Sequence, residues 1–240
     1  MQHLGFTRSA SHRDHLLQTP DTFVRAVLPG LRDAVAIVHA APAMGARFIE
    51  YTIEFSAGGS AELDGEQQFL YVLDGEIALQ GGRLGVGQYA YFPPGGGARI
   101  SAYAAARAVV ISKRHEALSG RGTNFFTGDE RNIASTPLGD DALQVRALVP
   151  ADDAYDFAVN TMTFQPGATL PMVEIHVMEH GLLMLEGEGI YRLGENWYPA
   201  RAGDFIWMAP YCPQWFGALG KTPTKYLIYK DWNRLPPTSR

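Results

Sequence analysis

The chain has 240 residues, of which 46% are hydrophobic and 11% aromatic, and 20 Lys and Arg against 25 Asp and Glu give it a net charge of −5. This is an ordinary globular composition, and the chain is long enough for two domains that each bury a core. The absence of a Lys/Arg cluster, of any apolar stretch near ~18 residues and of a signal-peptide core leads us to expect a cytoplasmic protein without nucleic-acid or membrane partners.

The predicted elements are strands. Glycine (26) and proline (15) exceed average usage and separate short runs of alternating apolar residues, which is typical of an all-β protein. In chain order, the predicted strands cover residues 47–55, 68–73, 88–92, 108–113, 157–164, 181–185, 189–193, 204–208 and 225–229. No amphipathic helix longer than about two turns is expected in either half.

The chain contains an internal repeat. Residues 69–76 (FLYVLDGE) match 181–188 (GLLMLEGE), and residues 87–94 (GQYAYFPP) match 203–210 (GDFIWMAP). The offset between the copies is 112 residues at the first match and 116 at the second. We therefore predict two tandem β domains, at 1–119 and 141–240, with the polar residues 120–140 as a connector.

Each copy has a strand, a Gly-Glu hairpin, a second strand and an aromatic strand that ends at proline. This order resembles the cupin superfamily over nearly the whole chain. The resemblance implies an all-β bicupin, in which each half is a double-stranded β-helix, or jelly-roll barrel, with a pocket at its mouth.

One segment concentrates groups that can bind metal. Residues 174–180 read EIHVMEH, and strand alternation places Glu174 and His176 on one face. In a straight strand His176 and His180 would lie about 13 Å apart, too far to share an ion. A bend within residues 177–179 would bring them together, so the metal-site hypothesis depends on it. A helical alternative, similar to part of a zincin motif, lacks the Glu after the first His.

The resemblance to cupin metal sites extends this set. It implies that Glu174, His176 and His180 occupy three ligand positions, and counting eleven residues from Gly203 gives Gln214 as the fourth. A carboxylate, two imidazoles and an amide oxygen without a thiolate favour Mn²⁺, with Fe²⁺ and Ni²⁺ as alternatives. The remaining positive charge favours a small anionic substrate that chelates the ion.

The first copy has no imidazole at the corresponding positions, which are Glu62, Asp64, Gln68 and Ala98. A methyl group replaces the fourth ligand. We therefore expect one ion per chain, in the second barrel, and a metal-free N-terminal barrel that acts as a scaffold.

Several segments resemble the (S)-ureidoglycine aminohydrolases, bicupin enzymes of allantoin degradation in purine catabolism. They are residues 16–21, 157–162, 174–181, 187–191, 196–197 and 226–234, and the Glu-x-His-x-x-x-His order with a Gln ligand is the specific element. The resemblance implies Mn²⁺-dependent hydrolysis of (S)-ureidoglycine to (S)-ureidoglycolate and ammonia. It also implies that Tyr191, Tyr226 and Lys230 contact the substrate and that the protein is a homo-oligomer, with an octamer as the candidate size.

The catalytic group expected from this resemblance is Glu174, Lys230 and Tyr191. Glu174 is the first candidate for moving a proton as water replaces the amine, and Glu179 is the second. The polar residues near Asp129 and Glu130 offer no distinctive substrate contact. Two other functions stay open, a metal-dependent cupin dioxygenase or isomerase and a non-catalytic bicupin that binds a small molecule. The single cysteine, Cys212, fits a buried thiol better than a nucleophile.

Overall fold

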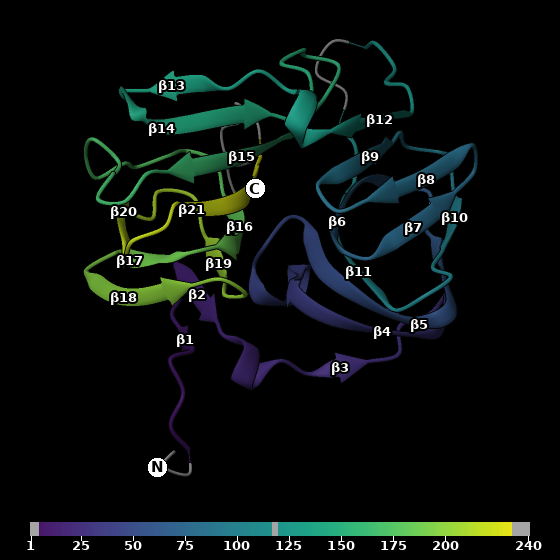
Figure 1. The fold of residues 1–240 in the computed structure, drawn as a ribbon, viewed down its shortest axis with the longest axis horizontal. Coiled ribbons are helices and arrows are strands. Elements are labelled where there is room, and N and C mark those ends of the chain that lie inside the picture. The colour runs from purple at the N-terminus through teal and green to yellow at the C-terminus, as the bar shows by residue number, and fades with distance from the viewer. Residues whose placement is uncertain (1–4, 117–119, 232–240) are drawn as a thin grey trace, which may run out of the picture. The chain divides into compact units, whose positions relative to one another are not determined.

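The structure, a computed structural model, describes residues 5–116 and 120–231 and is almost entirely β (Figure 1). The strands are β1 (Ala10–Ser11), β2 (His15–Gln18), β3 (Arg25–Ala26), β4 (Leu31–Ala40), β5 (Ile49–Leu63), β6 (Gln67–Asp74), β7 (Glu76–Leu79), β8 (Gly82–Gly85), β9 (Gln88–Phe92), β10 (Ala98–Ser101), β11 (Ala106–Lys113), β12 (Phe126–Asp129), β13 (Thr136–Leu138), β14 (Asp140–Ala147), β15 (Ala158–Phe164), β16 (His180–Glu186), β17 (Glu188–Leu193), β18 (Asn196–Arg201), β19 (Phe205–Met208), β20 (Gln214–Leu219) and β21 (Thr224–Lys230).

Helical structure is confined to short 3₁₀ turns in this part of the chain, at Pro20–Thr22, Pro42–Met44 and Glu130–Asn132. None of the described helices has the length and apolar character needed to cross a membrane. The prediction of an all-β protein is confirmed, and each of the nine predicted strands overlaps an observed one.

The chain forms two compact units whose bounds differ from the domains predicted at 1–119 and 141–240. The C-terminal unit comprises Met1–Phe23, Ala134–Leu148 and Phe157–Arg240, and the N-terminal unit comprises Val24–Ile133 and Val149–Asp156. Strand pairing explains the difference. β2 pairs with β19 and so joins the C-terminal unit, although it lies near the start of the chain. The predicted connector, 120–140, contains β12, which pairs with β9, and β13, which pairs with β14.

The C-terminal unit has two antiparallel sheets. Its eight-stranded sheet has the order β1-β2-β19-β16-β21-β15-β14-β13, and its three-stranded sheet has the order β18-β17-β20. Alternate residues of these strands point into one apolar core, because successive side chains of a strand face opposite sides. Core members include Leu17, Phe164, Leu182, Tyr191, Ile206, Phe216, Tyr226 and Ile228.

The N-terminal unit is built on one sheet of the order β12-β9-β6-β11-β5-β10-β7-β8, with β4 paired to β5 and β3 to β4. Its core includes Ile53, Phe55, Leu70, Val72, Ala90, Phe92, Ala108 and Val110. These residues alternate along β5, β6, β9 and β11, as the sequence pattern predicts.

The Gly-Glu turn of the repeat has the same physical basis in both units. Gly75 and Gly187 have φ angles of 70° and 73°, which L side chains rarely adopt. A Cβ at Gly75 would lie 2.7 Å from Ala105 O, and one at Gly187 would lie 2.5 Å from Thr224 Oγ1. Each hairpin therefore requires glycine, which explains why the sequence repeat is visible there.

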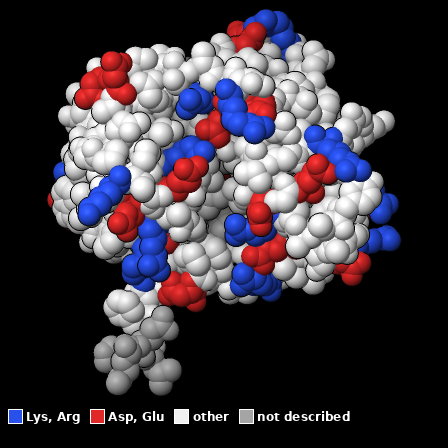
Figure 2. Space-filling view, in the orientation of Figure 1, with Lys and Arg blue, Asp and Glu red and all other residues white. Residues whose placement is uncertain are grey.

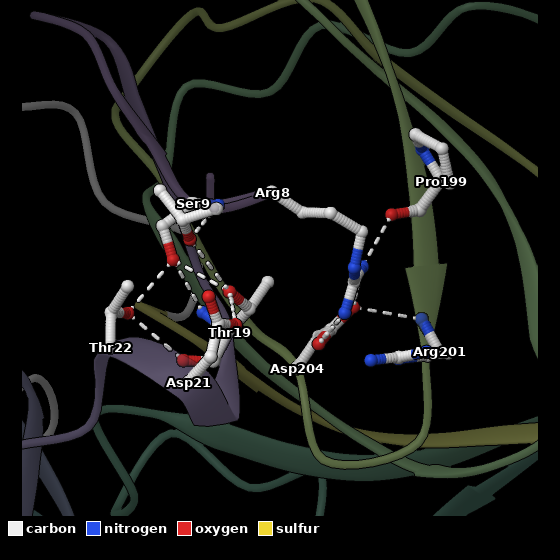
Figure 3. Close-up of polar contacts among 9 residues, drawn as sticks. Arg8, Ser9, Thr19, Asp21, Thr22, Pro199, Arg201 and Asp204 are labelled. Atoms are coloured by element: carbon white, nitrogen blue, oxygen red, sulfur yellow. Dashed lines mark hydrogen bonds and ion pairs between the residues drawn. The ribbon is translucent and has the colours of Figure 1, made fainter. Parts of the chain in front are cut away.

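The N-terminal segment is held in the C-terminal unit by a partly buried ion pair (Figure 3). The Arg8 guanidinium donates two hydrogen bonds of 2.7 Å to the Asp204 carboxylate and a third of 2.8 Å to Pro199 O. The Asp204 side chain is fully buried and also accepts a bond from Arg201 N. Beside the pair, Ser9, Asp21 and their hydroxyl partners Thr19 and Thr22 form a chain of short hydrogen bonds.

Stability of the N-terminal unit should depend on pH through Glu50. Its carboxyl is buried, its Oε2 has no hydrogen-bond partner among the described residues, and burial raises its pKa to about 8. Because the pKa of Glu50 is higher in the folded than in the unfolded protein, ionisation of this carboxyl favours unfolding. The stability is fully present below the unfolded-state pKa and is lost as pH rises through the folded-state pKa of about 8. Burial lowers the pKa of His39 to about 3, so this residue adds stability as pH rises. Its effect is complete near pH 6.5, the pKa of an unperturbed histidine.

We therefore expect the free energy of unfolding to fall by about 2 kcal/mol between pH 6.5 and pH 8, and Glu50→Gln to remove this fall. Urea denaturation of both proteins at the two pH values measures it. Equal pH dependence in the variant and the parent would contradict the assignment.

Candidate functional site

The loop before β16 is tied to the start of β20. Glu174 N donates to Gln214 O over 2.8 Å, and Gln214 N donates to Glu174 O over 2.9 Å. A further bond joins Tyr211 N to His176 O over 2.7 Å. This pairing brings Glu174 and Gln214, two of the four predicted ligand residues, next to each other although they are distant in the sequence.

The bend on which the metal-site hypothesis depends is present. The chain bends at Val177 and Met178, and β16 begins at His180. The His176 and His180 rings have centroids 5.0 Å apart, instead of the ~13 Å of a straight strand. His176 Nε2 also lies 3.0 Å from Glu174 Oε2, within hydrogen-bonding distance.

Strand register adds Lys230 to this group. His180, the first residue of β16, is directly opposite Lys230, the last residue of β21. Leu182 and Ile228, two residues along each strand, belong to the core. Alternation therefore turns His180 and Lys230 toward the barrel interior as well.

Two buried tyrosines complete the group. Tyr191 Oη donates to Gln214 Oε1 over 3.4 Å. Burial raises the pKa of both Tyr191 and Tyr226 well above the usual phenol value, and the Glu174 carboxylate acts in the same direction. Both hydroxyls therefore keep their protons at neutral pH and can donate hydrogen bonds.

Burial also lowers the pKa values of the two basic side chains of this group, His180 and Lys230. It lowers the pKa of His180 to about 3, so the imidazole is neutral at pH 7, the form that binds metals. It lowers the pKa of Lys230 too, and the negative charge of Glu174 opposes that shift.

The predicted ligands fit a divalent ion in chemistry. His180 Nδ1 is buried without a hydrogen-bond partner among the residues described, and a buried polar atom of this kind is costly unless something binds it. A carboxylate, a second imidazole and an amide oxygen lie near it. They form a looser group than Asp14, His15 and Cys212, the one described set of three His, Cys, Asp or Glu whose ligand atoms all lie within 4.8 Å of one another.

The other predicted residues lie in different settings. Glu179 is buried, and its Oε2 accepts a 3.1 Å hydrogen bond from Trp207 Nε1, so a structural partner holds it. Glu130 is buried in the N-terminal unit, where Tyr71 Oη donates to it at 2.5 Å, and is no exposed connector residue. Asn233 and Arg234, at the end of the family motif, lie outside the described residues.

The first copy holds an internal hydrogen-bond arrangement where the second has the predicted ligands. Gln68 Nε2 donates to Asp64 Oδ1 over 2.6 Å, and Ala98 begins β10. Ala98 also lines a cavity of about 380 Å³, whose other walls include Phe92, Arg99 and Phe125. The resemblance to cupins predicts a pocket in each half, but the sequence did not indicate which residues would line it.

Sequence reasoning also missed the surroundings of His15. The polar opening of the chain contains His12, Asp14 and His15, and the HLLQ run of β2 was too short to predict as a strand. Burial raises the pKa of the Cys212 thiol to about 11, which keeps it protonated at neutral pH and agrees with a buried thiol rather than a nucleophile.

Charged residues are interspersed elsewhere. Figure 2 shows Lys and Arg alternating with Asp and Glu over the described residues of the face drawn, without a continuous basic surface there. An anionic ligand bound in the C-terminal barrel would therefore depend on the cationic groups of the barrel itself.

Comparison with known proteins gives both the fold and the relatives. The model of the cupin domain family matches residues 160–229. The chain is 41% identical to an (S)-ureidoglycine aminohydrolase of Arabidopsis thaliana, over 97% of this chain and 80% of that protein. It is 30% identical to an (S)-ureidoglycine aminohydrolase of Escherichia coli, over 93% of this chain and 90% of that protein.

A crystal structure of the protein Ylba from E. coli superposes on 97% of either chain with a TM-score of 0.85 at 26% sequence identity. The two barrels of the structure are therefore cupin barrels, as the element order of the repeat predicts.

Proposed function

Because the chain belongs to the (S)-ureidoglycine aminohydrolase family, we propose that it hydrolyses (S)-ureidoglycine to (S)-ureidoglycolate and ammonia in purine catabolism. The observation that carries the proposal is the grouping of Glu174, His176, His180 and Gln214 beside Lys230 in one barrel. That grouping combines possible metal ligands, a cation and hydrogen-bond donors, which is what a small amino acid derivative with a carboxylate and a ureido group needs.

In this proposal Lys230 pairs with the substrate carboxylate, because it is the cation that faces the interior opposite His180. Tyr191 and Tyr226 donate hydrogen bonds that orient the ureido group. These contacts bind and orient the substrate.

Glu174 moves the proton. The oxygen of water forms a bond to the α-carbon of the substrate as the bond between that carbon and the amine nitrogen breaks. Glu174 accepts a proton from water and delivers one to the departing amine, which leaves as ammonia. The three catalytic residues of the proposal are thus Glu174, Lys230 and Tyr191.

Glu174, His176, His180 and Gln214 would hold the metal ion of the family. We assign Mn²⁺, with Fe²⁺ and Ni²⁺ as alternatives, because the set mixes oxygen and nitrogen donors without sulfur. When bound, such an ion supplies a Lewis acid that binds and polarises an anionic substrate.

A protein saturated with Mn²⁺ should bind about one ion per chain, because imidazoles occur at ligand positions only in the second copy. The double variant His176→Ala/His180→Ala should lose that ion. Elemental analysis after removal of free metal measures both values. Retention of Mn²⁺ by the double variant would refute the ligand assignment.

Lys230→Met should weaken kcat/KM roughly 10- to 150-fold, the equivalent of about 1.5–3 kcal/mol for a hydrogen bond to a charged group. The fold should tolerate it, because burial already disfavours the charge of Lys230. The control is Lys225→Met on the same strand, whose ammonium pairs with Glu186 over 2.7 Å on the surface. Equal kinetics for the two variants would show that Lys230 does not bind the substrate. Unfolding of Lys230→Met would show that Lys230 has a structural role.

The decisive experiment is an ammonia assay on freshly prepared ureidoglycine, with and without Mn²⁺, under anaerobic conditions. We expect ammonia release that depends on the metal and needs no oxygen. Oxygen consumption with Fe²⁺ and no ammonia would favour a dioxygenase, and a purified protein without metal or activity would favour a binding protein. Light scattering would test the proposed homo-oligomer, for which an octamer is the candidate size.

A further inference from the structure

A second group of side chains with potential metal-ligand atoms lies in the C-terminal unit, apart from the four proposed ligands. It consists of Asp14, His15 and Cys212, each of which offers one ligand atom, and these atoms all lie within 4.8 Å of one another. His15 and Cys212 are buried, whereas the Asp14 side chain is about half exposed. The group therefore has an open side toward the solvent.

Backbone pairing holds the three residues together. His15 begins β2 and is directly opposite Met208 of β19. Ala209, the next residue, donates from its N–H to Asp14 O over 2.9 Å and accepts from Cys212 N over 3.1 Å. The backbone at Ala209 thus fixes the positions of both Asp14 and Cys212.

A phenol holds the His15 ring in place. His15 Nε2 lies 2.9 Å from Tyr198 Oη, and His15 Nδ1 lies 2.9 Å from Asp14 Oδ1. Metal-binding histidines commonly use their second ring nitrogen for a hydrogen bond that fixes the ring. Tyr198 is positioned for that role at Nε2. An ion would replace the hydrogen bond between Nδ1 and the Asp14 carboxylate, with the ring proton on Nε2 and donated to Tyr198 Oη.

A glycine keeps space beside the group. A Cβ at Gly194 would lie 3.2 Å from Asp14 Oδ2 and 4.0 Å from His15 Nδ1. Gly194 also has a φ of 59°, a conformation that favours glycine. A side chain there would crowd the Asp14 carboxylate and contact the His15 ring.

Strand order places this group on the same interior row as the proposed active site. Lys230, His180, Met208 and His15 are neighbours in register on β21, β16, β19 and β2. Two strand spacings separate His15 from His180, roughly 10 Å. One ion cannot bridge that distance, so the two groups are separate.

We propose that Asp14, His15 and Cys212 form a second cation site, for a divalent ion of the Zn²⁺ class that prefers a thiolate ligand. Carboxylate, imidazole and thiolate together are a usual zinc donor set, whereas Mn²⁺ prefers oxygen donors. On binding, the ion replaces the thiol proton of Cys212, which leaves to the solvent. Water completes the coordination on the exposed side of Asp14.

Cobalt is the probe for the test, because a bond between Co²⁺ and a thiolate gives a charge-transfer absorption band in the near ultraviolet. Cys212 is the only cysteine of the chain, so this band reports on the proposed site alone. We expect the band in the parent protein and in His176→Ala/His180→Ala. Cys212→Ser should abolish it and lower the bound Co²⁺ from about two ions per chain to about one.

Two further variants keep the test decisive if Cys212→Ser does not fold. Asp14→Asn changes a half-exposed side chain and should weaken Co²⁺ binding at this site at least tenfold, and Tyr198→Phe should weaken it roughly 10- to 100-fold while the band remains. Absence of the band from the parent protein, its survival in Cys212→Ser, or unchanged affinity in both other variants would overturn the proposal. None of these measurements uses ureidoglycine, so their outcome is independent of the proposed activity.

Discussion

Glu174→Gln is expected to lower the turnover number at least ~10²-fold, the usual size of a general acid/base contribution. The substitution keeps the shape of the side chain and one oxygen donor but removes the negative charge and the ability to carry a proton at neutral pH. The backbone bonds between Glu174 and Gln214 do not involve the side chain, so the loop should keep its position. The variant should retain a measurable fraction of its Mn²⁺ and still bind substrate.

Glu179→Gln is the matched control. Trp207 Nε1 donates to the Glu179 carboxylate, and the amide oxygen of a glutamine can accept the same bond. We therefore expect a milder loss of turnover. Steady-state kinetics of both variants, with the metal content of each sample measured, decides between them. A metal-loaded Glu174→Gln enzyme with near-normal turnover, beside an inactive Glu179→Gln enzyme, would reverse the assignment.

Arg8→Met is expected to lower the free energy of unfolding by about 3 kcal/mol, because it leaves the fully buried Asp204 carboxylate without its cation. This is the lower end of the range for breaking a buried pair. Arg8 is one-fifth exposed, and Asp204 keeps the hydrogen bond from Arg201 N. Urea denaturation followed by tryptophan fluorescence measures the change.

Arg83→Met provides the comparison for this loss. Arg83 pairs with Glu76 over 3.0 Å, but both side chains are more than half exposed, and such pairs contribute at most about 1 kcal/mol. A loss of equal size in the two variants would show that the tie between Arg8 and Asp204 is no stronger than a surface contact.

The sequence predicted the fold where the information is local. Alternating apolar residues indicated the strands of both barrels, and the Gly-Glu turns revealed the repeat because Gly75 and Gly187 adopt a conformation that few other residues tolerate. The placement of β2 could not be predicted this way. Its four residues are too few for a periodic signal, and its partner β19 lies about 190 residues further along the chain.

The candidate site likewise has a part that local sequence predicts and a part that depends on strand register. Glu174, His176 and His180 lie within seven residues, so strand geometry was sufficient to require a bend between the histidines. The position of Lys230 opposite His180 depends on the register of β16 and β21, which no local spacing encodes. Likewise, nothing in the sequence near Cys212 indicates that Asp14 and His15 adjoin it, because backbone contacts to Ala209 bring them together.

The fastening of the N-terminal segment also affects how the chain can fold as it is synthesised. Arg8 leaves the ribosome 196 residues before Asp204, its partner in the C-terminal unit. The segment must therefore remain unpaired while the residues of the N-terminal unit emerge and begin to fold. Asp204 and β19, the strand with which β2 pairs, emerge after all strands of the N-terminal unit and after β13 to β18 of the C-terminal unit, so the segment that contains Arg8 and β2 is among the last parts of the C-terminal barrel to take its place.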